Sequence, residues 1–137
     1  MPELQINYLA VGVAALATVF IGAVWYSLLF SKLWMKAHGY SKEDLEQMRK
    51  TMGRAYIVSL FCYVVMALVL AVLVSWTGVS TVMQGALLGF LVWIGFLATL
   101  GLTANMFSEK PLSTYLLDAG YQLVYAVVMG VILAVWR

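Results

Sequence analysis

Residues 54–76 read RAYIVSLFCYVVMALVLAVLVSW, and this stretch decides the fold class because no charged side chain follows Arg54 within it. An α-helix needs about 20 consecutive apolar residues to cross the hydrocarbon core of a bilayer. Three further segments have a similar length and composition, at residues 7–30, 81–104 and 112–136. We therefore predict an all-α integral membrane protein, with four transmembrane helices in a single domain over residues 1–137.

The composition indicates the same environment. Hydrophobic residues make up 64% of the 137 residues and charged residues 10%, whereas soluble domains have about 25% charged residues. The formal net charge is only +2, and no basic stripe alternates with aromatic residues, which excludes nucleic-acid binding. Cys62 and His38 are the only cysteine and the only histidine. They supply neither a disulfide nor a metal site, and we expect no metal and no cofactor.

The positive charges predict the topology. Most of them lie between the first two segments, and one lies between the third and fourth: Lys32, Lys36, Lys42, Arg49, Lys50, Arg54 and Lys110. By the positive-inside rule these two connections face the cytoplasm, and both termini face the outside of a bacterial inner membrane. Because the later connections are short, we expect consecutive helices to pack antiparallel as a bundle.

The charged connection also contains a helix signal. Ser41 followed by Asp44 resembles a capping box, and Leu45, Met48 and Met52 recur at helical spacing. We predict a short amphipathic helix over about residues 41–52, lying on the cytoplasmic membrane interface. It either docks lipid headgroups or a partner, or it serves as a solvated linker.

Two patterns concern how the helices pack. VVMALVLAV at residues 64–72 is similar to VVMGVILAV at residues 127–135. The similarity indicates either two tandem helical hairpins related by a repeat, or chance likeness between apolar helices. Small residues at four-residue spacing also give every helix an edge that allows close approach. These edges are Ala10, Ala14, Thr18 and Gly22; Ala67, Ala71 and Ser75; Gly85 and Gly89; and Ala126, Gly130 and Ala134. They meet either within one chain or between chains.

Asp118 is the only acidic residue inside an apolar segment, which makes it the first functional candidate. Tyr121, Gln122 and Tyr125 share its helix face, and the third segment adds Thr99 and Asn105. Such a set suits a hydrated cavity, a small polar solute or a proton relay. The alternative is an ion pair of Asp118 with Arg54 or Lys110 near the cytoplasmic headgroups. No nucleophile–base pair or phosphate loop occurs, so we do not expect an enzyme.

Two stretches carry a family resemblance. Residues 25–36 read WYSLLFSKLWMK, and residues 105–111 are followed by DAGYQL at 118–123. The chain thereby resembles domain of unknown function 1761, a family of small four-helix bacterial membrane proteins, over nearly its whole length. The resemblance implies an integral membrane protein and no particular activity. The aromatic and basic side chains of the first stretch fit either membrane anchoring or a partner groove: Trp25, Tyr26, Ser27, Lys32, Trp34 and Lys36.

Two functions follow from these observations. The first is a small solute or ion transporter or channel, working as a homo-oligomer because one four-helix bundle encloses little lumen. The second is an accessory or scaffold protein without transport activity. It would bind a membrane-protein partner or lipid headgroups through the cytoplasmic connection.

Overall fold

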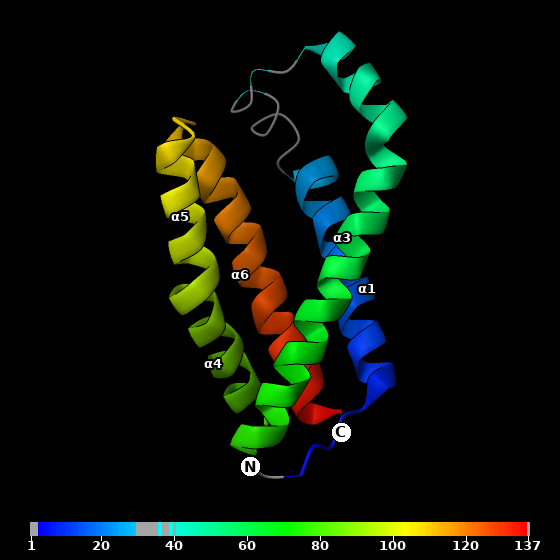
Figure 1. Cartoon of the computed structure of the whole chain (residues 1–137), viewed down its shortest axis with the longest axis vertical. Coiled ribbons are helices and arrows are strands. Elements are labelled where there is room, and N and C mark those ends of the chain that lie inside the picture. Colours follow the sequence, from blue (N-terminus) through cyan, green and yellow to red (C-terminus); the bar gives the residue numbers. More distant parts are fainter. Residues whose placement is uncertain (1–2, 30–35, 37–38, 40, 137) are drawn as a thin grey trace.

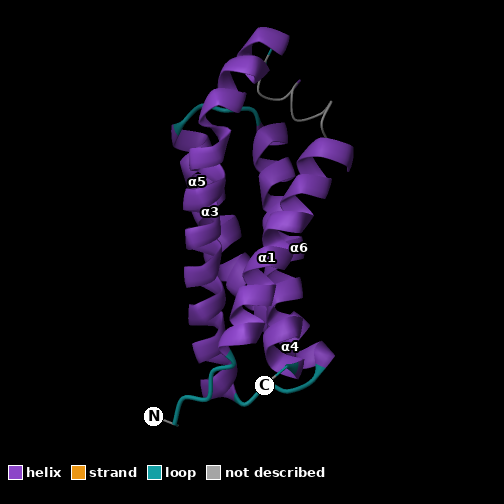
Figure 2. Ribbon diagram, turned by 90° about the vertical axis from the view of Figure 1, so that its right-hand side faces the viewer, coloured by secondary structure: helices purple, strands orange, loops and turns teal. Residues whose placement is uncertain are grey.

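The computed structural model describes residues 3–29, 36, 39 and 41–136. Within these residues all regular structure is helical, and four helices are long and apolar enough to cross a membrane (Figure 2). Their bounds are Tyr8–Ser27, Met52–Thr77, Val82–Phe107 and Leu112–Val135. The all-helical class and the four apolar segments predicted from the sequence are confirmed.

The chain follows a simple order of elements (Figure 1). Two of the helices continue into a π-helical turn, in which the hydrogen-bonded ring holds one more residue than in an α-helix. The elements are α1 (Tyr8–Val24), η1 (Trp25–Leu29), α3 (Lys42–Thr77), α4 (Val82–Val92), η2 (Trp93–Leu97), α5 (Ala98–Phe107) and α6 (Leu112–Val135).

Helix ends follow from local chemistry. The Asn7 side chain caps α1 by accepting the N–H groups of Leu9 and Ala10 at 3.1 and 3.2 Å. Gly78 ends α3 in the left-handed conformation, with φ of 74°, which glycine adopts without a steric penalty. Pro111 stands directly before α6, where its missing N–H costs little.

The start of α3 confirms one prediction and corrects another. The Ser41 hydroxyl accepts the Asp44 N–H at 3.2 Å, and the Asp44 carboxylate accepts the Ser41 N–H at 2.9 Å. This is the expected capping box. The helix that begins there does not end before the membrane span, however, because α3 runs unbroken from Lys42 to Thr77. The separate helix over residues 41–52 is therefore absent. One glycine, Gly53, without a proline weakens a helix but does not end it.

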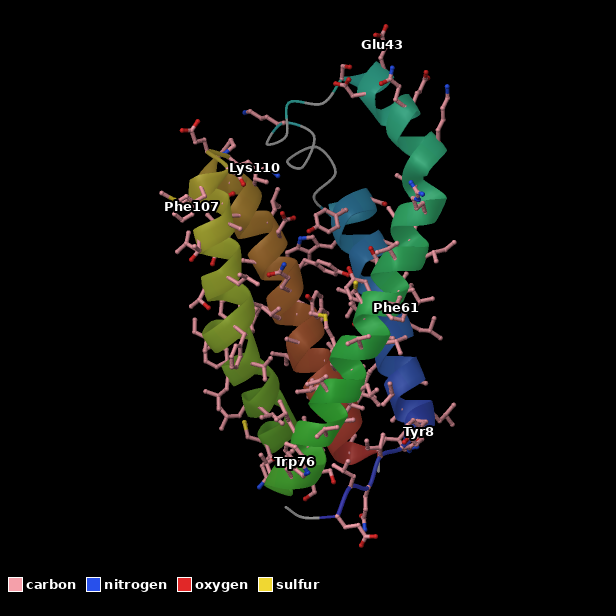
Figure 3. All side chains as sticks on the ribbon, viewed as in Figure 1. Tyr8, Glu43, Phe61, Trp76, Phe107 and Lys110 are labelled. Carbon is pink, nitrogen blue, oxygen red and sulfur yellow. The ribbon has the colours of Figure 1, made fainter. Side chains whose placement is uncertain are left out.

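α6 is the central helix. It packs against α1, α3 and α4, and it lies between the α4–α5 rod and the α1–α3 pair in Figure 1. Of its most apolar stretch 39% is buried, compared with 17% for the span Val82–Phe107. Phe61 and Phe107, which Figure 3 labels, are large apolar side chains that are 69% and 87% exposed, as expected for residues that face lipid.

The small-residue edges meet within the chain. A Cβ atom on Gly85 would lie 2.8 Å from Ala134 Cβ, and one on Gly89 would lie 2.8 Å from the Ala126 carbonyl carbon. The edges of α1 and α3 are buried together in the core, at Ala10, Ala14, Thr18, Ala67 and Ala71. Close helix approach through small residues is thus the main packing device of this bundle.

The packing is not two-fold symmetric. α1 packs against α6, whereas α4 makes no comparable contact with α3 among the described residues. Two tandem hairpins related by a two-fold axis would make these two contacts equivalent. The similar runs in α3 and α6 therefore have different surroundings.

Different segments of the chain lie at the two ends of the molecule. The Gln5 N–H donates to the Ser75 hydroxyl at 3.0 Å, and the Asn7 amide donates to the Trp136 carbonyl at 3.4 Å. These bonds gather the N-terminal segment, the end of α3 and the end of α6 at one end. Glu43 and Lys110 lie at the opposite end, far from Tyr8 and Trp76 (Figure 3).

Candidate functional site

Asp118 lies in the second turn of α6, about 9 Å along the helix axis from Leu112. Its side chain is half-buried. The Tyr26 hydroxyl, from η1, donates to Asp118 Oδ1 at 2.6 Å. A hydrogen bond this short is typical of a hydroxyl that faces a carboxylate. The partner of the carboxylate is thus a neutral group.

The ion pair considered from the sequence is not formed. Among the described residues no ion pair joins Asp118 to Arg54 or to Lys110. Arg54 is exposed on α3. Tyr26 occupies the position beside the carboxylate that a cation would take in the ion-pair alternative.

Four tyrosines from three helices pack around this contact, and we call them the tyrosine cluster: Tyr26, Tyr63, Tyr121 and Tyr125. The ring centroids of Tyr26 and Tyr121 are 5.3 Å apart, and those of Tyr121 and Tyr125 are 4.9 Å apart, both nearly perpendicular. The Tyr63 ring lies 5.6 Å from Tyr125. Edge-to-face aromatic pairs are favourable contacts, so the cluster joins η1, α3 and α6 at the level of Asp118.

The hydroxyl protons of the cluster have defined directions. The Tyr121 oxygen lies 2.9 Å from the Thr18 carbonyl oxygen and 3.2 Å from the Tyr63 oxygen. A carbonyl only accepts and a phenol has one proton, so Tyr121 donates to Thr18 and Tyr63 donates to Tyr121. Gly22 makes this arrangement possible, because a Cβ atom there would lie 2.8 Å from the Tyr121 oxygen.

Two indoles hold α6 on either side of Asp118. Trp25 Nε1 donates to the Leu117 carbonyl at 3.1 Å, and Trp93 Nε1 donates to the Ala119 carbonyl at 2.9 Å. Each tryptophan is the first residue of a π turn, η1 or η2. π turns inside α-helices are frequent at functional sites.

Asp118 lines one hollow and is hydrogen-bonded to a residue that lines a second. The first, which we call the polar hollow, lies between α5 and α6 and has a volume of about 180 Å³. Its polar lining consists of Asn105, Ser108, Lys110, Thr114, Tyr115, Asp118 and Gln122. The second, the tyrosine hollow, has a volume of about 130 Å³. It is lined by Val19, Gly22, Ala23, Tyr26, Ser27, Tyr56, Ser59, Tyr63 and Tyr121. Since Asp118 lines the first and accepts from Tyr26 of the second, its carboxylate links the two.

The structure brings most of the predicted polar residues together. Asn105, Asp118 and Gln122 share the polar hollow, and Tyr121 and Tyr125 belong to the tyrosine cluster. Asn105 also has a structural task, because its amide donates to the Lys110 carbonyl at 3.2 Å across the α5–α6 turn.

Thr99 does not belong to this group. Its side chain is exposed, and its hydroxyl donates to the Gly95 carbonyl on its own helix at 2.9 Å. Thr99 and Asn105 are six residues apart, which places them about 120° apart around an α-helix. Asn105 lines the polar hollow and Thr99 does not.

The candidate residues of the aromatic and basic stretch at residues 25–36 have different surroundings. Trp25 and Tyr26 turn inward to α6, and the exposed Ser27 lines the tyrosine hollow. Lys36 is exposed. Lys32 and Trp34 lie outside the described residues. In the part of the chain that the structure describes, no cluster of His, Cys, Asp and Glu side chains is suited to hold a metal ion.

Sequence reasoning missed Trp93 and the partnership of Tyr63 with Tyr121. For Trp93 a signal exists, because tryptophan prefers the membrane interface and Trp93 stands in the middle of its span. A tryptophan at that depth needs an acceptor for its N–H. The π turns have no comparable mark in the sequence.

Residues 9–134 match a family described as "Protein of unknown function (DUF1761)". The chain belongs to this family. The resemblance drawn from the WYS and DAGYQL stretches is thereby confirmed, and the DUF1761 description assigns no activity. Comparisons with curated proteins and with solved structures give no match.

Proposed function

We propose that this DUF1761 protein is a transporter of the bacterial inner membrane that binds a small cation and carries it across the bilayer, with Asp118 as counter-charge. One observation carries the proposal: the only acidic side chain of the apolar segments is half-buried and is held by a neutral hydroxyl. A carboxylate inside a membrane-spanning segment is costly, and such residues commonly mark ion pathways and proton relays. In the proposed cycle Asp118 holds a proton and a cation in turn.

The arrangement in the membrane is part of the proposal. The four spans run antiparallel, with both termini outside and the two charged connections in the cytoplasm. The hollows beside Asp118 would then lie at the cytoplasmic end of the bundle. We propose that a homo-oligomer supplies the rest of the path between its subunits. The proposal includes no enzymatic activity.

Flux measurements test the proposal. The purified protein is placed in liposomes that contain a pH-sensitive dye, and Na⁺, K⁺ or ethylammonium is added outside. The wild type should release protons in exchange for at least one of these cations, and Asp118→Asn should show no more exchange than empty liposomes. Asp44→Asn is the matched control, because it makes the same change outside the spans, at the third position of the capping box, where an Asn side-chain oxygen can still accept the Ser41 N–H.

Two outcomes would refute the transport proposal. In the first, Asp118→Asn exchanges cations as fast as the wild type. In the second, the wild type is indistinguishable from empty liposomes although circular dichroism shows a folded helical protein.

A second function, an accessory or scaffold role, is favoured by one observation. α3 extends past the span Met52–Thr77 by the segment Lys42–Thr51, which is about 15 Å long. Glu43, Glu46 and Lys50 are exposed on it. Such a charged extension suits a partner surface. If it serves as one, reversing Glu43 and Glu46 to Lys should release a copurifying partner without changing cation exchange.

A further inference from the structure

The tyrosine hollow has the size of a small organic ligand. Its volume is about 130 Å³, and an engineered protein cavity of about 150 Å³ holds benzene. The hollow therefore admits a molecule of up to about five non-hydrogen atoms. Its walls come from α1, η1, α3 and α6, so a ligand there would touch three of the four spans.

The hydroxyls of this hollow are biased toward accepting hydrogen bonds. Tyr121 donates its proton to the Thr18 carbonyl, and Tyr63 donates its proton to Tyr121. Each phenol has only one proton, so these two oxygens offer lone pairs to a ligand and no donor. Ser59 and Tyr56 line the same hollow and are able to accept as well. A fitting ligand brings the N–H or O–H groups itself.

The electrostatics favour a positive charge on that ligand. Tyr26 lines the hollow, and its hydroxyl donates to the Asp118 carboxylate at 2.6 Å. The faces of tyrosine rings attract organic cations. A divalent metal ion prefers several carboxylate or carbonyl oxygens, whereas this lining supplies hydroxyls and rings.

We propose that the tyrosine hollow binds a small primary alkylammonium ion. Its ammonium group lies against the oxygens of Tyr63 and Tyr121, and its short alkyl chain lies against Val19 and Ala23. This inference rests on the proposed role of Asp118 as the counter-charge of the site, and it names the chemical class of the cation.

Binding to the full-length protein in nanodiscs tests the inference. Isothermal titration calorimetry with ethylammonium should give saturable binding, and ethanol, a neutral molecule of nearly the same size, should bind at least tenfold more weakly. Tyr63→Phe keeps the ring and removes one acceptor, so it should weaken ethylammonium binding by about tenfold or more. Tyr8→Phe is the matched control, because it also removes one tyrosine hydroxyl, and Tyr8 is exposed on α1 and lines neither hollow. It should bind as the wild type does.

A second variant fills the hollow. Ser59→Leu should abolish ethylammonium binding while the far-ultraviolet circular dichroism spectrum stays that of a helical protein. The inference is overturned if ethanol or K⁺ competes equally with ethylammonium, if Tyr63→Phe and Tyr8→Phe bind alike, or if Ser59→Leu still binds.

The two proposals fail in different ways. Ethylammonium binding without any cation exchange in liposomes would refute transport and leave the ligand class intact. Exchange of Na⁺ or K⁺ that depends on Asp118, without ethylammonium binding, would refute the ligand class and leave transport intact.

Discussion

Replacing Gly89 by Ala tests the packing of α4 against α6 most directly. The added Cβ atom would overlap the Ala126 carbonyl oxygen, and it would lie 2.8 Å from the Ala126 carbonyl carbon and 2.9 Å from Val127 Cα. All three atoms belong to the α6 backbone, so no side-chain rotation relieves the contact. The two helices must separate by roughly 1 Å to restore ordinary contacts with all three atoms.

The expected loss follows from that separation. A gap of about 0.5–1 Å removes a quarter to a half of the dispersion energy across the contact, and overpacking typically costs about 1–3 kcal/mol. The helix preference of Ala over Gly returns up to about 1 kcal/mol. We therefore expect Gly89→Ala to lower the free energy of unfolding by about 1–2 kcal/mol.

Gly12→Ala is the control for this variant. A Cβ atom on Gly12 meets nothing within 4 Å, so the variant has the same gain in helix preference without the overlap. It should be as stable as the wild type or more stable. Both variants are unfolded by sodium dodecyl sulfate in mixed micelles and followed by circular dichroism. Equal free energies of unfolding for Gly89→Ala and Gly12→Ala would refute the close packing of α4 and α6.

Two further predictions concern single hydrogen bonds. Ser41→Ala should destabilise the first turn of α3 by about 0.5–2 kcal/mol. Amide hydrogen exchange at residues 42–44 should therefore accelerate, while exchange in the span stays slow. Unchanged rates at residues 42–44 would contradict the capping box. Trp93→Phe removes the bond to Ala119 and should cost about 1 kcal/mol in the detergent titration. Trp76→Phe, at an exposed position, should lower the free energy of unfolding by less. An equal loss in both variants would show that the indole bond of Trp93 does not stabilise the fold.

The spans and their close-packing edges were predictable because they depend on local composition. A helix of about 20 apolar residues is stable in few environments other than a bilayer. A row of small residues allows close approach to whichever helix it meets. The choice of partner was not predictable for the same reason. The edges of Gly85 and Gly130 are chemically interchangeable with those of Ala14 and Ala71, and only the three-dimensional arrangement pairs them.

The sequence pointed to Asp118 as the central residue of the candidate site, but not to the side chains that surround it. Asp118 stood out because a carboxylate in an apolar segment is costly. Its partner Tyr26 is 92 residues away in the sequence and belongs to an aromatic stretch that also fits a membrane anchor. A long-range contact between two helices leaves no periodic trace in either of them. Thr99 was wrongly grouped with Asn105 because shared polarity was considered without their angle around the helix.

The two indole bonds restrict how α6 can move. The accepting carbonyls of Leu117 and Ala119 are two residues apart, which puts them on nearly opposite sides of the helix. Trp25 holds one side from η1, and Trp93 holds the other from η2. A roll of α6 about its own axis would break both bonds at once, whereas a tilt that uses this level as a pivot would keep both. Asp118 stands at the pivot, so its position changes least when the two ends of α6 swing.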